Sequence, residues 1–174
     1  ELDIRWMSLL PYQRILYSKK GLRRKVYFVW ERYKNFIVDM DGVIYRGKQA
    51  LPGSADFFQF LRERNSRIAF FSNNSTITKK QYIYKLQNMN ILATEDEIIS
   101  SSSITAYYVS KENPKSKVFC IGEDGIRDEL LINGIQIVDD PSSEDVDLVV
   151  VGLDRQFNFT KLTKAMRCIL KGAQ

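Results

Sequence analysis

From residue 35 onward, short apolar runs alternate with segments whose apolar residues recur at helical spacing. The strand-like runs cover residues 36–39, Ile68–Phe71, Ile98–Ile99, Val118–Ile121, Ile135–Val138 and Asp147–Val151. The helical patterns cover Ser54–Arg64, Thr78–Asn90, Ile104–Ser110, Gly125–Asn133 and Thr160–Leu170. This alternation predicts βαβ units with right-handed crossovers, so we expect an α/β protein built on a parallel sheet.

Capping and turn residues set the expected boundaries of these elements. Ser54 is the predicted N-cap of the helix that it begins, and Gly134 is the predicted C-cap of the helix that ends at Asn133. The stretch from Tyr45 to Gly53, which contains Pro52, is predicted to be a loop. The polar stretch over residues 111–117 is typical of a linker between two runs of α/β elements.

The composition restricts the available chemistry. A chain of 174 residues suits one domain, or one domain and part of another, and it contains no histidine. Nucleophilic pairs of Ser or Cys with His are therefore excluded, and catalysis must use carboxylates, hydroxyls, lysines or a metal. Cys120 and Cys168 lack metal-site spacing and favour a reducing compartment. We expect no transmembrane segment, because no apolar run approaches the required length.

The basic charge is concentrated in residues 1–34. This segment holds nine Lys or Arg against three acids, a net charge of +6, in a chain whose net charge is +5. Its cations are interleaved with aromatic residues, a pattern that suits RNA, an acidic partner or an anionic membrane surface. An amphipathic helical extension with a solvated basic face is the alternative interpretation.

Two carboxylates, Asp39 and Asp41, lie at the end of an apolar run and are followed by Gly42. If Ile37 and Val38 lie in a buried strand, the two acids leave its C-terminal end on the same side. Acids held that close become useful when a cation sits between them, or when one keeps its proton and acts as an acid. The alternative is a strand followed by an ordinary Asp-Gly turn.

A second polar cluster runs from Ser72 to Thr76 and follows the strand-like run Ile68–Phe71. In a parallel sheet it emerges at the same carboxyl edge as Asp39 and Asp41, where open α/β folds bind ligands. Hydroxyl and amide side chains that lead into a helix can hold a phosphate oxygen. Taken alone, the cluster also fits a polar strand-to-helix turn.

These residues resemble a known family. The run Asp39 to Val43, with Ser72 to Ser75, resembles motifs I and II of the haloacid dehalogenase (HAD) superfamily. The resemblance is closest to its NagD-like, 4-nitrophenylphosphatase and phosphoglycolate phosphatase branch, and it covers about residues 35–174. Further matching stretches are Val43–Gly47, Val118–Gly125, Val149–Asp154 and Phe159–Ala165.

The resemblance implies a three-part organisation. Residues 1–34 would be a basic, aromatic-rich helical extension. Residues 35–112 would be the first half of a HAD-type Rossmannoid parallel sheet, and residues 117–174 part of a C2-type α/β cap domain. In this branch a motif III lysine and a motif IV acid follow the cap, so the resemblance implies that the chain is C-terminally incomplete.

The resemblance also implies a mechanism for Mg²⁺-dependent hydrolysis of small phosphate monoesters. Asp39 would be the nucleophile that forms an aspartyl phosphate, and Asp41 would be the acid and base. The Asp39 carboxylate and the Asp41 backbone carbonyl would bind Mg²⁺. The implied phosphate-binding or substrate-binding residues are Gly42, Ser72, Asn73 and Asn74.

Other implied features are less sharply defined. The loop from Gly152 to Gln156 corresponds to the place where this branch reads its substrate, with Arg155 and Gln156 as weak candidates. Dimerisation through the cap is common in the branch. The expected location is cytoplasmic, with an organellar matrix as the alternative.

Two hypotheses about function remain open from the sequence. The first is a phosphatase that acts on a small phosphorylated metabolite. The second is a catalytically inactive binding or structural module derived from such an enzyme, whose basic residues 1–34 dock RNA or a protein partner.

Overall fold

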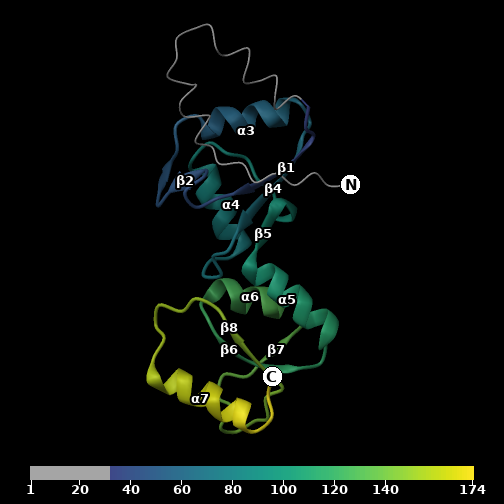
Figure 1. Cartoon of the computed structure of the whole chain (residues 1–174), viewed down its shortest axis with the longest axis vertical. Coiled ribbons are helices and arrows are strands. Elements are labelled where there is room, and N and C mark those ends of the chain that lie inside the picture. The colour runs from purple at the N-terminus through teal and green to yellow at the C-terminus, as the bar shows by residue number, and fades with distance from the viewer. Residues whose placement is uncertain (1–31) are drawn as a thin grey trace, which may run out of the picture. The chain divides into compact units, whose positions relative to one another are not determined.

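The computed structural model describes residues 32–174, which fall into two compact units (Figure 1). Within this range the first unit comprises residues 32–72 and 83–98, and the second comprises residues 73–82 and 99–174. The predictions made for residues 1–31 lie outside the described residues. No helix in residues 32–174 is both long enough and apolar enough to cross a membrane.

The first unit is organised around a sheet of three strands in the order β1-β4-β5. These strands are β1 (Asn35–Asp39), β4 (Arg67–Ser72) and β5 (Ile98–Ser100), the last of which begins where this unit ends. Strands β1 and β4 are parallel, with Phe36 opposite Ile68 and Asp39 opposite Phe71. The remaining elements are the hairpin β2 (Tyr45–Arg46) and β3 (Gln49–Ala50), α3 (Ser54–Glu63) and the 3-10 turn η1 (Glu95–Glu97). Helix α4 (Lys79–Gln87) is divided between the units, and its part from Ile83 onward belongs to the first.

Aromatic side chains from α3 and the sheet form the core of this unit. Phe36 contacts Phe57 edge-on at 6.2 Å between ring centroids, and Phe58 lies 5.0 Å from Phe70. Phe58 and Phe70 are buried almost completely. The apolar positions of the helix predicted at Ser54–Arg64 therefore face the sheet, as their spacing requires.

The second unit contains another sheet of three strands, in the order β7-β6-β8. Strands β7 (Gln136–Ile137) and β8 (Leu148–Val151) both run parallel to the central strand β6 (Lys117–Ile121). The helices are α5 (Ser101–Glu112), α6 (Asp124–Ile132) and α7 (Phe159–Leu170).

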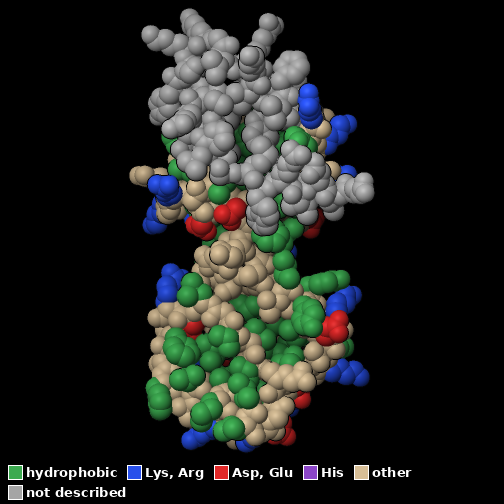
Figure 2. All heavy atoms as spheres, viewed as in Figure 1, with side chains coloured by type: hydrophobic (Ala, Val, Ile, Leu, Met, Phe, Trp, Pro, Cys, Tyr) green, Lys and Arg blue, Asp and Glu red, His purple; other side chains and the backbone are tan. Residues whose placement is uncertain are grey.

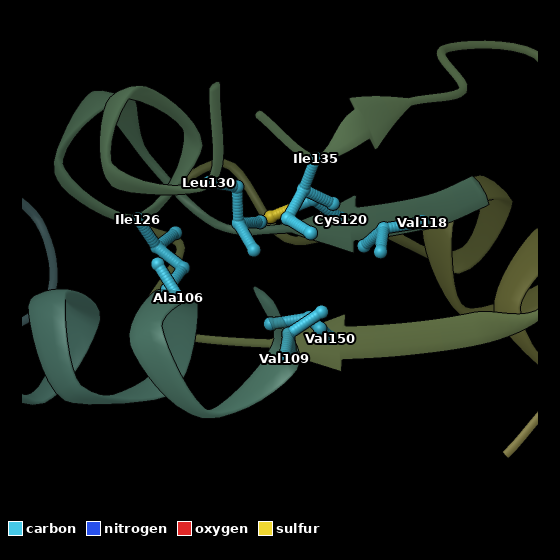
Figure 3. Close-up of a cluster of buried hydrophobic side chains, with 8 residues drawn as sticks. All are labelled: Ala106, Val109, Val118, Cys120, Ile126, Leu130, Ile135 and Val150. Atoms are coloured by element: carbon cyan, nitrogen blue, oxygen red, sulfur yellow. The ribbon is translucent and has the colours of Figure 1, made fainter. Parts of the chain in front are cut away.

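Both faces of the β6 strand are covered, which explains its unbroken apolar run. Val118 and Cys120 pack with side chains of α5 and α6 in the cluster drawn in Figure 3. Phe119 and Ile121 point to the other face and pack with Ala165 and Cys168 of α7. A strand buried on both faces is typical of parallel sheets covered by helices.

Helix α7 also presents an apolar stripe that no described residue covers. Figure 2 shows hydrophobic side chains gathered over the second unit. On α7 the exposed ones recur at helical spacing and are Phe159, Leu162, Met166, Ile169 and Leu170.

The predicted α/β class and parallel strands are confirmed, but three local predictions are wrong. Ser54 is not the N-cap; Gly53 is, with φ 84°, and the Ser54 hydroxyl instead donates a hydrogen bond of 2.9 Å to the Ile44 carbonyl. The predicted loop at residues 45–53 contains the β2–β3 hairpin. Ile37 is not buried, since 55% of its surface is exposed on β1.

Gly134 behaves largely as predicted. Helix α6 ends at Ile132, its C-cap is Asn133, and Gly134 follows in the left-handed region with φ 77°. A residue without Cβ is favoured there because it adopts this conformation without strain.

We predict that Phe58→Ala destabilises the first unit by about 3–5 kcal/mol, because it leaves a cavity among packed rings. Phe60→Ala is the matched control. Phe60 lies on the same helix but is only half-buried, with the Arg64 guanidinium over its ring. Its expected cost is about 1 kcal/mol. Urea unfolding measures both, and equal losses would contradict the packing described.

Candidate active site

The pairing of β1 with β4 brings two predicted site residues to one edge of the sheet. Asp39 ends β1 and lies opposite Phe71, and the next amide, that of Met40, donates a hydrogen bond of 3.2 Å to the Phe71 carbonyl. Ser72 follows directly as the last residue of β4 and is buried. The carboxyl ends of the two parallel strands therefore meet at this edge, as the sequence predicted.

A tight turn, and not strand alternation, positions Asp41. Strand β1 ends at Asp39, and the amides of Ile44 and Tyr45 then bond back to the Met40 carbonyl at 2.9 and 3.3 Å. Gly42 takes φ 84° and donates its amide to the Tyr45 carbonyl at 2.7 Å. Strand β1 stops before Asp41, so the turn and not strand alternation sets the orientation of this residue.

The Asp41 carboxylate has two neighbours from the first unit. The hydroxyl of Tyr45 donates to its Oδ2 at 3.4 Å, and the ammonium of Lys85 lies 3.9 Å from its Oδ1. The same Lys85 nitrogen lies 3.5 Å from the centroid of the buried Tyr45 ring. Burial lowers the pKa of Lys85, and the Asp41 charge offsets part of that effect.

Lys85 was not among the site residues predicted from the sequence. A weak signal existed, because Lys85 follows the buried Tyr82 by three residues and precedes the buried Leu86 by one. It therefore lies at the border of the apolar stripe of α4, where a lysine stem packs against apolar surface while its head stays polar. Nothing in the local pattern indicates that this head meets Asp41.

Two oxygen donors at this edge fit a magnesium ion. The Asp39 carboxylate makes no hydrogen bond or ion pair with any residue of the described range, and the Asp41 backbone carbonyl accepts none from it. Both are hard oxygen ligands, and Mg²⁺ in proteins is commonly held by one or two such groups together with water and phosphate oxygens. Residues 32–174 contain no cluster of three or more side chains that could hold a metal.

The turn after β4 belongs to the second unit. The Asn73 carbonyl accepts a hydrogen bond of 2.9 Å from the Ser101 hydroxyl. The side-chain oxygen of Asn74 accepts the Thr76 amide at 2.9 Å, and its carbonyl accepts the Tyr82 hydroxyl at 3.2 Å. Asn73 and Asn74 thus form a bonded turn ahead of α4, and one Asn74 oxygen is already used within it.

Close backbone contacts hold this turn inside the second unit. The Gly125 amide donates to the Thr76 carbonyl at 3.2 Å, and a Cβ at Gly125 would lie 2.6 Å from backbone atoms of Ile77 and Ser75. The Ser75 hydroxyl accepts the Leu153 amide at 3.0 Å. Glycine at position 125 is required by this approach of two backbones.

The weak candidate Arg155 is engaged in an ion pair. Its backbone amide and Nε donate to one oxygen of Glu123 at 2.9 and 2.8 Å, and its Nη2 pairs with the other. These bonds from Arg155 hold the pKa of Glu123 at about 2. The Gln156 amide donates a hydrogen bond of 2.8 Å to Asp154 Oδ1, and the Lys161 ammonium lies 2.6 Å from Asp154 Oδ2. These bonds order the loop after β8.

Comparison with known proteins gives consistent matches. A model of the haloacid dehalogenase-like hydrolase family matches residues 36–136. The acid sugar phosphatase of Staphylococcus saprophyticus is 35% identical over 144 residues, which is 83% of this chain and 54% of that protein. The 5'-nucleotidase YutF of Bacillus subtilis is 33% identical over 142 residues, 82% of this chain and 54% of that protein.

A solved structure has the same fold. The crystal structure of 4-nitrophenylphosphatase from Thermotoga maritima superimposes with a TM-score of 0.74 at 33% identity, over 83% of this chain and 54% of that one. The chain thus spans about half the length of the relatives that it matches.

We predict that Gly125→Ala destabilises the second unit by about 3 kcal/mol, because the methyl group would overlap backbone that cannot move aside cheaply. Gly134→Ala is the control in the same unit. A Cβ at that position would meet no atom within 4 Å, so only left-handed strain of about 1 kcal/mol is expected. Denaturant unfolding measures the difference. Faster exchange of the residue-125 amide in Gly125→Ala would locate the damage, and a loss of stability no larger than that of Gly134→Ala would contradict the contact.

Proposed function

The chain belongs to the family of haloacid dehalogenase-like hydrolases, in its NagD-like and 4-nitrophenylphosphatase branch, and we propose that it carries the nucleophile and the acid–base residue of a phosphatase site. One observation carries this proposal. In the first unit, the parallel register that sets Asp39 opposite Phe71 brings Asp39 and Ser72 to one edge of the sheet. A carboxylate without a partner among residues 32–174, at the same sheet edge as the buried Ser72, suits an incoming phosphoryl group.

In the proposed reaction an oxygen of the Asp39 carboxylate attacks phosphorus, and the bond from phosphorus to the ester oxygen breaks. Asp41 gives its proton to that leaving oxygen. Asp41, now a carboxylate, then takes a proton from water. The resulting hydroxide attacks phosphorus, the bond to Asp39 breaks, and inorganic phosphate leaves with the nucleophile restored.

The surrounding residues have supporting roles in this proposal. Ser72 hydrogen-bonds the transferring phosphoryl group and Asn73 orients it, while Gly42 and Asn74 shape the two turns that border it. Mg²⁺, held by the Asp39 carboxylate and the Asp41 carbonyl, would neutralise charge on the phosphoryl oxygens. The names of the relatives, an acid sugar phosphatase and a 5'-nucleotidase, support a small phosphorylated metabolite as substrate.

Three further predictions from the sequence belong to this proposal. They are the three-part division at residues 1–34, 35–112 and 117–174, a cytoplasmic location and a homodimer formed through the cap. The inactive module that docks RNA or a protein through residues 1–34 is not favoured by the relatives, which carry the names of enzymes.

We expect the purified chain to release phosphate from 4-nitrophenyl phosphate only when Mg²⁺ is present. Asp39→Asn should lower the rate by roughly a thousandfold or more, because an amide is a poor nucleophile. Asp56→Asn is the matched control, since Asp56 is an exposed acid in the first turn of α3. Its rate should stay within about twofold of the parent.

Two results would count against the proposal. One is turnover that survives Asp39→Asn or removal of Mg²⁺ by a chelator. The other is a folded chain that releases no phosphate but retains nucleic acid in a salt-sensitive manner, with that retention lost when residues 1–34 are deleted.

A further inference from the structure

Tyr45 is held rigidly beside Asp41. Its side chain is fully buried although it follows Asp41 by only four residues. Its backbone is bonded on both sides within the same turn, with its amide on the Met40 carbonyl and its carbonyl on the Gly42 amide. The ring and its hydroxyl therefore have little freedom to move relative to the Asp41 backbone.

Helix α4 places Lys85 over the Tyr45 ring. Lys85 lies on α4 between two side chains of negligible exposure, Tyr82 and Leu86, which anchor the helix. Its ammonium lies over the Tyr45 ring at 3.5 Å, within the range in which a cation is attracted by an aromatic face. This contact restrains a lysine head that would otherwise sample many rotamers.

Tyr45 and Lys85 contact different oxygens of the Asp41 carboxylate. Lys85 lies 3.9 Å from Oδ1, an ion-pair distance, and the Tyr45 hydroxyl donates to Oδ2 at 3.4 Å. Nearly half of the Asp41 side chain is exposed, so packing alone does not set its torsion angles. One contact on each oxygen favours a single orientation of the carboxyl plane.

We propose that Lys85, together with Tyr45, is a positioning residue that holds the Asp41 carboxyl group in the orientation needed for proton transfer to the leaving oxygen. This role rests on the function proposed above, in which Asp41 is the acid. A general acid must lie within hydrogen-bond reach of the oxygen that it protonates, and small misplacements are costly. Lys85 itself touches neither substrate nor metal in this role.

The proposal predicts a dependence on the leaving group. An alkyl phosphate expels a basic alkoxide and needs the proton, whereas 4-nitrophenolate leaves without one. The parameter to compare is kcat/KM, because it reports the steps up to departure of the leaving group. Hydrolysis of the phosphoenzyme, which is common to all substrates, does not enter it.

The experiment compares Lys85→Met, Lys85→Arg and Lys80→Met in the full chain, with Mg²⁺, on an alkyl phosphate and on 4-nitrophenyl phosphate. Methionine keeps apolar packing on the Tyr45 ring but removes the charge, so the protein should fold. We expect Lys85→Met to lower kcat/KM about thirtyfold for the alkyl ester and less than about threefold for the aryl ester. Arginine should restore most of the loss, and loss of the exposed Lys80 on the same helix should change neither value.

Tyr45→Phe provides a second test because it removes only the hydroxyl. It should also slow the alkyl ester selectively, and its effect should not add fully to that of Lys85→Met, since both act on one carboxylate. Equal losses on the two esters, an unchanged kcat/KM, or a rise in KM alone would overturn the positioning role.

A structural measurement separates this proposal from the function on which it rests. If the parent chain releases phosphate from neither ester, the phosphatase proposal fails. Crystal structures of the parent and of Lys85→Met then decide the positioning role. A carboxyl group of Asp41 that rotates or splits into two orientations in the variant supports it, and an unmoved carboxyl group refutes it.

Discussion

The parallel pairing of β1 with β4 is the constraint on which the rest of the first unit depends. Its register ends both strands at one edge, and this alone brings Asp39 and Ser72 together from opposite sides of helix α3 in the sequence. Phe36 of β1 and Phe70 of β4 pack against Phe57 and Phe58 of α3, and this aromatic core stabilises the pairing. A slip of one residue would move buried side chains to the exposed face.

The two acids after β1 have different surroundings, and this difference supports different roles. Asp39 has no bonded partner among residues 32–174, which is compatible with the proposed roles of nucleophile and metal ligand. Asp41 is contacted on both oxygens by Tyr45 and Lys85. Carboxylates of one chemical type acquire separate functions in this way, through the environment that each side chain is given.

The features that depend on local periodicity could be predicted from the sequence. The contacts of a side chain with a residue far away in the sequence could not. Alternating strand and helix patterns, and the shared edge of Asp39 and Ser72, follow from local spacing. The hydroxyl of Ser54 was misassigned because its partner, the Ile44 carbonyl, is ten residues away and competes with capping. Lys85 was not predicted because it contacts Asp41 across forty-four residues of sequence, a separation that no local pattern covers.

The contact between Gly125 and Ile77 links segments that the sequence separates by almost fifty residues. Their backbones are so close that neither segment can change shape without the other. A chimaera assembled from this chain and a relative must therefore take the turn at residues 73–77 and the start of α6 from the same parent. A library that randomises one of the two segments should keep the other fixed, with glycine at position 125.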